Sequence, residues 1–266
     1  MIRQFTLIAS LTLGVTAITA ATLACRLPLQ PTGPEQTKSE TVEAGAAESA
    51  DVEISLGAGE LTVAGGATEL MEAEFTFNIE AWEPEVDYSV NGDKGFLTVR
   101  QPDEEGLRIP DTDVRYTWDL QFNDEVPLDM QVNMGAGEGL IDLRTLTVGN
   151  LDLRTGAGNV SALLGGSQLT NADISAGIGE TTIDLSGDWE NDASIVIKAG
   201  VGDMTVIVPR EVGVIADVAM GIGEINADGF RTQGGSYTND AYEDSAITLR
   251  VEIDGGVGEI TLIVAE

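Results

Sequence analysis

Acidic side chains recur directly after a short glycine motif, and these are the residues in the sequence best suited to chemistry. The motif is Gly, a small apolar residue, Gly, and then an acid or amide. Two such carboxylates could act as acid and base in glycoside hydrolysis, and a stacked row of them could ligate calcium. The recurring carboxylates are Glu60, Glu138, Glu180, Asp203, Glu224 and Glu259.

The setting of these carboxylates favours neither use. The sequence has no histidine, which excludes Ser-His-Asp and Cys-His catalysis. A catalytic acid needs a distinct apolar pocket to shift its pKa, and a row of equivalent exposed corners offers none. Calcium-binding β-rolls place Asp after the glycines of a repeat of about nine residues, which this chain lacks. We therefore expect a protein that is not an enzyme, with no cofactor and no metal site.

The spacing of the glycine motif predicts a stacked repeat. The central steps from one motif to the next are 21, 21, 23 and 21 residues, and two further copies lie outside this series. A nearly fixed period of this size is typical of repeat architectures. The motifs begin at Gly57, Gly135, Gly156, Gly177, Gly200, Gly221 and Gly256.

Apolar residues lie three and five positions before the first glycine of every motif, as Leu151 and Leu153 do before Gly156. This alternation predicts a strand with one buried face, and a second short strand follows each motif. The apolar phase slips by one residue across the motif, so the backbone must bend there. Glycine permits the positive φ or the close backbone approach that such a bend needs, and we expect the small residue between the glycines to point inward.

We predict an all-β fold, specifically a single-stranded β-solenoid with Gly-x-Gly corners and about 21 residues per coil. Two alternatives remain open. Each motif could close an antiparallel hairpin, or two units could form one propeller blade of about 40 residues. The modest size of the apolar residues and an aromatic content of 5% favour the narrow core of a solenoid.

The first residues read as an export signal, because Arg3 precedes an apolar run and small residues precede Cys25. Cys25 is the only cysteine, and Thr22-Leu23-Ala24 before it resembles a bacterial lipobox with Leu one place closer to the cysteine than usual. We predict a signal over 1–25 and lipidation of Cys25. The protein is then extracytoplasmic and anchored to the cell membrane by lipid; an ordinary cleaved signal, giving a secreted protein, is the alternative.

The rest of the chain divides by composition. Residues 26–49 lack apolar periodicity and are predicted to be a disordered tether. Residues 50–130 form an N-terminal β region with hairpins, which either caps the solenoid or makes its first coils. Residues 131–266 form the regular solenoid, with an insertion at 229–244 that lengthens the last step between motifs.

The insertion is the first place to expect a recognition surface, because it departs from the repeat and carries aromatic residues. Trp82, Trp118 and Trp189 could form a carbohydrate-stacking platform, although packing is the better default for a tryptophan near a strand. Trp189 lies in a predicted turn and is the one most worth testing as an exposed contact. The predicted surface comprises Phe230, Arg231, Tyr237, Tyr242 and Trp189.

The formal net charge of −32 limits the partners. Nucleic acid and anionic lipid headgroups would be repelled, so the membrane contact is expected only through the N-terminal lipid anchor. Such a charge mainly keeps a β-rich repeat soluble. It also permits a cationic peptide as a partner, beside an envelope glycan or a protein, and it leaves the oligomeric state open.

Four segments of the chain match a pattern known from other proteins: residues 56–61, 134–139, 239–242 and 255–260. Through these segments the chain resembles the bacterial toast-rack family. The resemblance implies an extracytoplasmic β-solenoid with distant similarity to cell-wall-active antibiotic response proteins of the LiaF type and to adhesin heads, and it brings no catalytic residues. We expect a non-enzymatic cell-envelope protein that binds or scaffolds, with a link to envelope stress; an adhesin-like or self-associating structural surface protein is the alternative.

Overall fold

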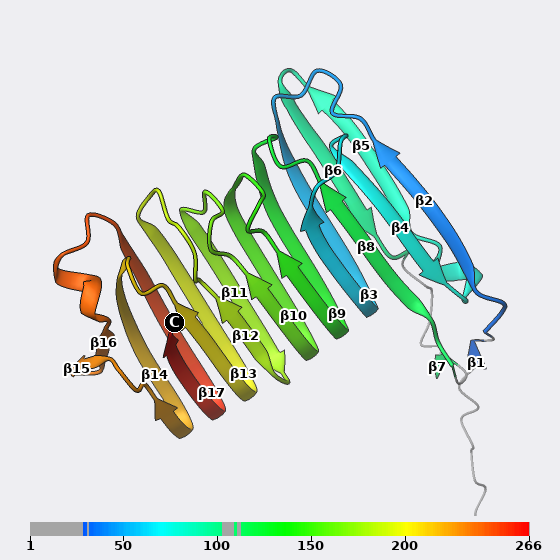
Figure 1. Ribbon diagram of the computed structural model, residues 1–266. Coiled ribbons are helices and arrows are strands. Elements are labelled where there is room, and N and C mark those ends of the chain that lie inside the picture. Colours follow the sequence, from blue (N-terminus) through cyan, green and yellow to red (C-terminus); the bar gives the residue numbers. More distant parts are fainter. Residues whose placement is uncertain (1–28, 31, 103–108, 111–112, 266) are drawn as a thin grey trace, which may run out of the picture.

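The protein is all-β, as the apolar alternation predicts (Figure 1). The computed structural model describes residues 29–30, 32–102, 109–110 and 113–265. Fifteen of the described strands form one sheet, and β1 pairs with β7 apart from it. The strands are β1 (Leu29–Gln30), β2 (Gln36–Val42), β3 (Ser49–Gly65), β4 (Met71–Phe77), β5 (Glu85–Asn91), β6 (Lys94–Arg100), β7 (Ile109–Pro110), β8 (Tyr116–Phe122), β9 (Leu128–Asp142), β10 (Val148–Leu163), β11 (Asn171–Ile178), β12 (Thr181–Asp184), β13 (Ala193–Val208), β14 (Gly213–Asn226), β15 (Arg231–Gln233), β16 (Ser236–Thr238) and β17 (Thr248–Val264), with short 3-10 helices η1 (Glu80–Trp82) and η2 (Asp240–Glu243).

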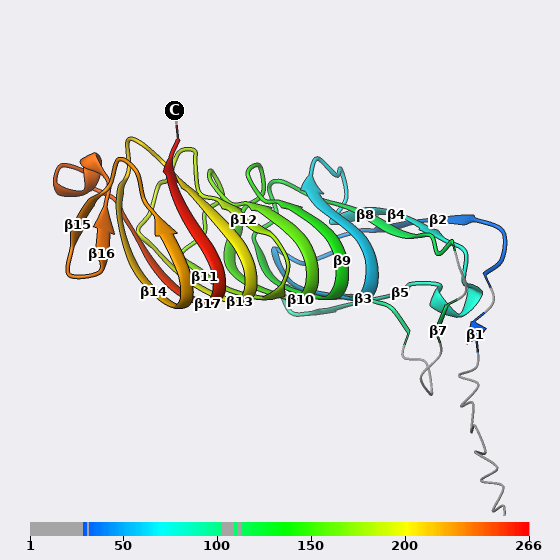
Figure 2. The same cartoon turned by 90° about the horizontal axis from the view of Figure 1, so that it is seen from below.

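The long strands lie parallel and side by side across the molecule, stacked along its length, and each bends near its middle (Figures 1 and 2). We call each such bent strand a pass, and its halves before and after the bend its first and second arms. Leu151 in β10 pairs with Met130 of β9 on one side and with Ala172 of β11 on the other. Asn150 likewise contacts partners 21 residues away on both sides. In this central part the 21-residue step between glycine motifs is therefore the length of chain from one pass to the next. Strands β11 and β12 together make one such pass, since both pair with β10 and β13.

The spatial order of the last passes differs from their order in the chain. Strand β17 pairs in parallel with β13 on one side and with β14 on the other. The final strand therefore fills a slot between two earlier ones, and the 21-residue step from Gly200 to Gly221 does not join neighbouring passes. The equal spacing in the sequence did not predict this, because each pass carries the same pattern and fits several neighbours.

The glycine motifs form the bends, and their two glycines have different roles. A Cβ on Gly156 would lie 2.3 Å from the carbonyl oxygen of Gly135 in the neighbouring pass, whereas a Cβ on Gly158 would lie 1.8 Å from that of Gly137. The two glycines differ in backbone conformation, since φ is positive at Gly158, 132°, but not at Gly156. Because both would-be Cβ atoms point along the stack, any side chain at either position would collide with the next pass.

The middle residue of each motif points outward, so the expectation that it points inward is wrong. Ile178 is 64% exposed and Ile222 is 71% exposed. The reason is the direction of the bend. The flanking glycines face the neighbouring passes, which leaves the middle side chain on the convex outside of the corner.

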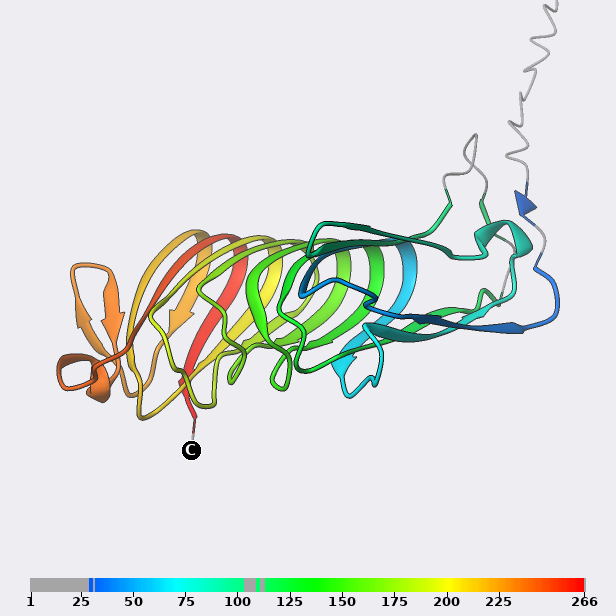
Figure 3. The same cartoon turned by 90° about the horizontal axis from the view of Figure 1, so that it is seen from above.

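Figure 3 shows that the stack of strands is elongated. One core of buried apolar side chains runs through it. The predicted inward positions are buried, for example Leu151 at 3% and Leu153 at 1% exposure. Side chains from the connections between passes close the opposite side; Leu143, Leu164 and Leu185 are each fully buried. Apolar burial at about 25 cal/mol per Å² is the main force that holds such a stack together.

The N-terminal end of the stack is covered. Strand β6 pairs with the first arm of β3, and β8 pairs with its second arm. Between them, the Gln101 side-chain oxygen accepts hydrogen bonds from the backbone nitrogens of Gly57 at 2.9 Å and Ala58 at 3.4 Å. Strands β5, β4 and β2 extend this cover, which prevents open pairing at the edge of the first pass.

The prediction of a disordered tether across 26–49 is wrong for Gln36–Val42. These residues form β2, which pairs antiparallel with β4 along its whole length. Their sequence shows no apolar alternation because β2 is an edge strand with mostly exposed side chains. Main-chain hydrogen bonds to β4 hold it in place, and Val42 is the buried residue at its end.

The insertion forms a hairpin at the C-terminal end. Strand β16 pairs with β15 and also with Ile215–Asp217 of β14, and η2 follows. Asn239 is 1% exposed and fastens this hairpin to the stack. Its side-chain nitrogen donates to the carbonyls of Pro209 at 3.0 Å and Val212 at 2.7 Å, and its oxygen accepts from the Val214 backbone at 2.9 Å.

Candidate functional site

The corner carboxylates line up but do not converge on a common point. The parallel register places Glu60 beside Glu138, and Glu259 between Asp203 and Glu224. All of these side chains are exposed. Within the described part of the chain, no group of three or more acidic, histidine or cysteine residues is placed to hold a metal ion. Glu60 and Glu138 line two open pockets of about 320 and 460 Å³, in which both carboxylates remain exposed.

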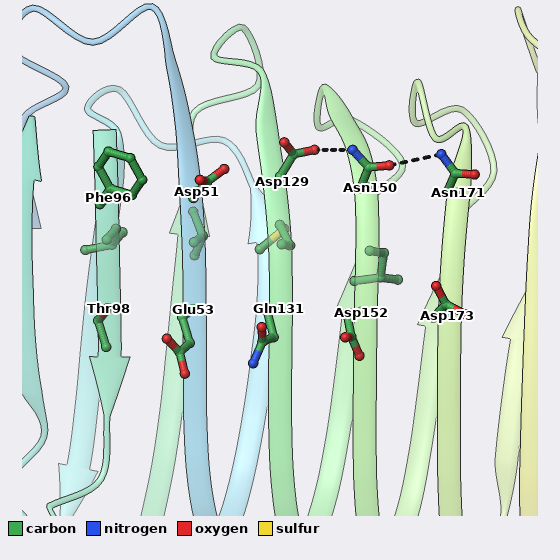
Figure 4. Close-up of a pocket in the computed structure, with 14 residues that line it drawn as sticks. Asp51, Glu53, Phe96, Thr98, Asp129, Gln131, Asn150, Asp152, Asn171 and Asp173 are labelled. Carbon is green, nitrogen blue, oxygen red and sulfur yellow. Dashed lines mark hydrogen bonds between the residues drawn. The ribbon is translucent and has the colours of Figure 1, made fainter. Parts of the chain in front are cut away.

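A broader polar array lies on the outward face of the first arms, before the corners (Figure 4). It is made by the residues that alternate with the buried positions of β3, β9, β10 and β11. We call it the acid–amide face. Its first row is Asp51, Asp129, Asn150 and Asn171, and its second row is Glu53, Gln131, Asp152 and Asp173.

Hydrogen bonds between passes hold the first row in place. The Asn150 side-chain nitrogen donates to Oδ1 of Asp129 at 2.6 Å, and that of Asn171 donates to Oδ1 of Asn150 at 3.0 Å (Figure 4). Lys94 lies 2.7 Å from Asp51 and 3.9 Å from Asp129. Its hydrogen bond to Asp51 raises the pKa of Lys94, so this cation stays charged at neutral pH. The row is thus a pre-ordered polar surface.

The second row keeps more free acceptors. Arg154 pairs with Asp152 at 2.5 Å. Glu53 and Asp173 form no ion pair with any residue that the structure describes. Their carboxylates can therefore accept hydrogen bonds from a ligand without first breaking a bridge within the protein.

Both rows line a shallow pocket of about 410 Å³, and an aromatic ring stands at its end. The ring is Phe96 of β6, which pairs with Asp51 in the register and is 41% exposed (Figure 4). Phe96 is not part of the buried core, so the exposed part of its ring is available to a ligand. A ligand in this pocket would contact the ring at one end and planar polar groups along its length.

Four of the predicted recognition residues lie together on the C-terminal insertion. Arg231 pairs with Asp240 at 3.0 Å, and its side chain is 60% exposed. Phe230 and Tyr237 are half-buried and pack against the core, while Tyr242 is half-buried in η2. Much of their surface thus closes the end of the stack, and no pocket among those described is lined by them.

Trp189 is not an exposed contact, so that expectation is wrong. It is 5% exposed, and its indole nitrogen donates to the carbonyl of Leu185 at 2.8 Å. Trp118 is fully buried and meets the ring of Phe75 edge-on. Trp82 is half-buried against Tyr116. The three tryptophans pack in different places and do not make a common platform.

Two residues of consequence were not found from the sequence. Phe96 lies in the N-terminal region for which only hairpins are predicted, although its alternation with Leu97 and Val99, both buried, indicates an outward position. Asn239 lies in a segment that carries the family resemblance, yet nothing in its neighbours indicated that the side chain is buried. The predicted lipidation site Cys25 lies outside the described residues. Among the described residues, no helix has the length and apolar character to span a membrane.

Comparison with a family model and with one solved structure agrees with this architecture. The family described as "N-terminal domain of toast_rack, DUF2154" matches residues 31–168 and again residues 148–207. A solved structure from Clostridium sporogenes ATCC 15579, described as a "putative cell adhesion protein", shares 27% identity, with a TM-score of 0.68 over 87% of this chain and 100% of its own. A "putative adhesin" from Bacteroides fragilis NCTC 9343 shares 11% identity and a TM-score of 0.34, over 88% of this chain and 99% of its own.

No curated protein matches the chain. The two family matches span well over half of it, and the motifs at residues 56–61 and 134–139 lie within them at stacked corners. The expected resemblance is thereby confirmed: this chain belongs to the toast-rack family.

Proposed function

We propose that this protein is a non-enzymatic, adhesin-like module of the cell surface that recognises glycans through its acid–amide face. The observation that carries the proposal is the shallow pocket in which exposed Phe96 stands at the end of two rows of carboxylates and amides. A structural relative with 27% identity, described as a "putative cell adhesion protein", supports an adhesive role.

The chemistry of the face suits a sugar polymer. Hydroxyl groups both donate and accept, amides do the same, and carboxylates accept. An aromatic ring offers an apolar platform on which the face of a pyranose can lie. Neighbouring passes are about 4.8 Å apart, so the face offers similar contacts repeatedly along a chain of sugars.

The charge of the face restricts which glycan fits. Its carboxylates outnumber the cations Lys94 and Arg154 that pair with them. Acidic glycans would be repelled at this surface. Neutral glycans and those with amino or N-acetyl groups are the class that we propose. The carboxylates on the face are Asp51, Glu53, Asp129, Asp152 and Asp173.

We further propose that the protein is exported and anchored through lipidated Cys25. Strand β2 lies at the covered end of the stack (Figure 1). An anchor that precedes β2 would leave the passes from β9 onward farther from the membrane, where they can meet ligands. Metabolic labelling with palmitate tests the anchor: the wild type should incorporate label and Cys25→Ser should not, whereas equal labelling would exclude Cys25 as the site.

Self-association is a second candidate, and one observation favours it. On its outer side β14 pairs with β16 only over Ile215–Asp217, so no described strand covers its edge from Ala219 to Asn226. An open edge with one charge, Glu224, can accept a strand from another molecule. Sedimentation over a range of concentrations tests this: a dimer that Ala219→Lys abolishes supports it, and a monomer at all concentrations excludes it.

Glycan binding is tested by calorimetric titration of the purified protein with an N-acetylglucosamine hexamer, beside a neutral-glycan array. Phe96→Ala should weaken binding by about 3- to 10-fold, as expected for an aromatic contact of about 0.5–1.5 kcal/mol. Asn150→Ala should weaken it similarly, and Glu138→Gln at the corner serves as the control with unchanged binding. If no glycan on the array binds, or if Phe96→Ala binds as tightly as the wild type, the proposal is wrong.

A further inference from the structure

The outward middle residues of the glycine motifs form an apolar ridge along one edge of the stack. In the order of the passes they are Ile178, Val201, Val257 and Ile222, which are neighbours in the parallel register. They are 64%, 49%, 44% and 71% exposed, respectively. We call these four residues the corner ridge. Large apolar side chains in a continuous exposed row mark interaction surfaces rather than chance exposure.

The ridge is confined to one half of the molecule. The equivalent residues of the other passes are Ala58, Ala136 and Ala157, which continue the same row. The backbone and the flanking glycines are the same in both halves, so the fold itself does not require the larger side chains. The difference points to a role outside the protein's own packing.

A row of carboxylates runs beside the ridge, two residues further along each pass. It consists of Glu180, Asp203, Glu259 and Glu224, all exposed. Glu259 accepts hydrogen bonds from Asn226 at 2.7 Å and Thr261 at 3.2 Å. None of the four forms an ion pair with any residue that the structure describes. The surface therefore pairs an apolar strip with an unneutralised negative strip.

This combination selects the occupant by charge. A second copy of this chain docked ridge to ridge would place its own carboxylate row against this one. Anionic lipid would be repelled in the same way. A ligand with apolar and basic side chains on adjacent faces would satisfy both strips at once.

The spacing further selects a helix. Ridge residues on neighbouring passes are about 4.8 Å apart. Residues on one face of an α-helix are about 5–6 Å apart, which nearly matches the ridge, whereas same-face residues of an extended strand are about 6.6 Å apart. The four ridge positions span about 14 Å, the length of a helix of about 10 residues.

We propose that the corner ridge binds a basic amphipathic helix, whose apolar stripe packs along Ile178, Val201, Val257 and Ile222 while its Lys or Arg side chains pair with the adjacent carboxylate row. This site is separate from the acid–amide face and does not depend on glycan binding.

A labelled model peptide tests the proposal in fluorescence anisotropy with the full protein. The probe is a helix of about 14 residues built from Leu and Lys, with Leu on one face. The double variant Ile178→Ser/Ile222→Ser should raise the dissociation constant about tenfold or more, and Glu180→Gln/Asp203→Asn should do the same at low salt. Ala136→Ser and Glu138→Gln, at equivalent positions in the alanine half, should leave binding unchanged. Circular dichroism melts check that all variants fold.

A scrambled peptide and a variant at the proposed glycan site serve as controls. A peptide of identical composition with Leu and Lys scrambled should bind at least about tenfold more weakly; equal binding would reduce the contact to net charge and overturn the proposal. Wild-type affinity in the ridge variants would also overturn it. Phe96→Ala should leave peptide binding intact, which separates this site from the proposed glycan site.

Discussion

Replacement of Gly158 by alanine should destabilise the protein strongly, because the new Cβ has no room. It would lie 1.8 Å from the carbonyl oxygen of Gly137, 2.8 Å from its carbonyl carbon and 3.0 Å from its nitrogen. Favourable carbon contacts begin at about 3.5 Å. The two passes must therefore separate at the corner, which disturbs the main-chain pairing of β9 and β10 on both sides of it.

The expected size of the effect is a sum of three terms. The left-handed backbone at φ 132° disfavours a residue with a Cβ by about 1–2 kcal/mol. Overpacking adds about 1–3 kcal/mol, and weakened hydrogen bonds add about 1 kcal/mol each. A loss of about 3–6 kcal/mol in the free energy of unfolding lowers the melting temperature by about 6–24 °C in a domain of this size.

Matched glycine variants separate the two causes. Gly92 has φ 70° with nothing within 4 Å of a would-be Cβ, so Gly92→Ala should lose only about 1 kcal/mol. Gly156 lacks the positive φ but would collide with Gly135 at 2.3 Å, so Gly156→Ala should fall between the other two. Thermal and urea melts followed by circular dichroism measure all three. If Gly158→Ala melts within about 2 °C of Gly92→Ala, a difference of no more than about 1 kcal/mol, close packing of the passes does not explain the glycines.

The remaining predictions concern the two ends and the core. Gln101→Ala should reduce the free energy of unfolding by about 0.5–1.5 kcal/mol and speed hydrogen exchange at the backbone amides of Gly57 and Ala58. Gln101→Glu, which keeps the acceptor, should preserve slow exchange. Unchanged exchange in the alanine variant would show that Gln101 does not protect the corner of the first pass. Asn239→Ala should reduce the free energy of unfolding by about 2–4 kcal/mol, since its buried backbone partners lose three hydrogen bonds. Limited proteolysis should then cut within residues 229–244, and an insertion that resists cleavage would contradict this. Trp189→Ala should reduce the free energy of unfolding by about 3–5 kcal/mol and leave glycan affinity unchanged. A loss of glycan affinity without a loss of stability would instead show that Trp189 contacts the ligand.

The repeat and its corners could be predicted because they depend on local chemistry. Alternating apolar residues such as Leu151 and Leu153 identify the buried face without knowledge of the neighbours. Gly156 and Gly158 indicate a bend, because few residues other than glycine fit the backbone conformation and close packing of such a bend. In the centre of the stack, equal spacing also aligns equivalent positions of consecutive passes.

Other features depend on tertiary context that the sequence does not specify. The place of β17 between β13 and β14 could not be predicted, because a strand with the common pattern can pair with any pass. Strand β2 was missed because an edge strand is held by main-chain bonds, which leave no apolar signature. Trp189 was misjudged because its turn folds back over the core, where the indole finds the Leu185 carbonyl.

The candidate site was visible in its parts but not as a whole. The polar residues between buried positions were present in the sequence as isolated solvent-facing residues. Only the register shows that Asp129, Asn150 and Asn171 form a hydrogen-bonded row. Phe96 reaches the end of that row through the pairing of β6 with β3, which joins segments that are far apart in the sequence.

Carboxyl footprinting of the protein with and without the N-acetylglucosamine hexamer tests the central claim most directly. The protein is modified with a carbodiimide and an amine, and each labelled acid is located by mass spectrometry. Glycan binding at the acid–amide face predicts protection of Glu53 and Asp173, while the corner residues Glu138 and Asp203 label as before. Protection of the corner residues instead, or no protection at any carboxylate at a saturating glycan concentration, would contradict the account.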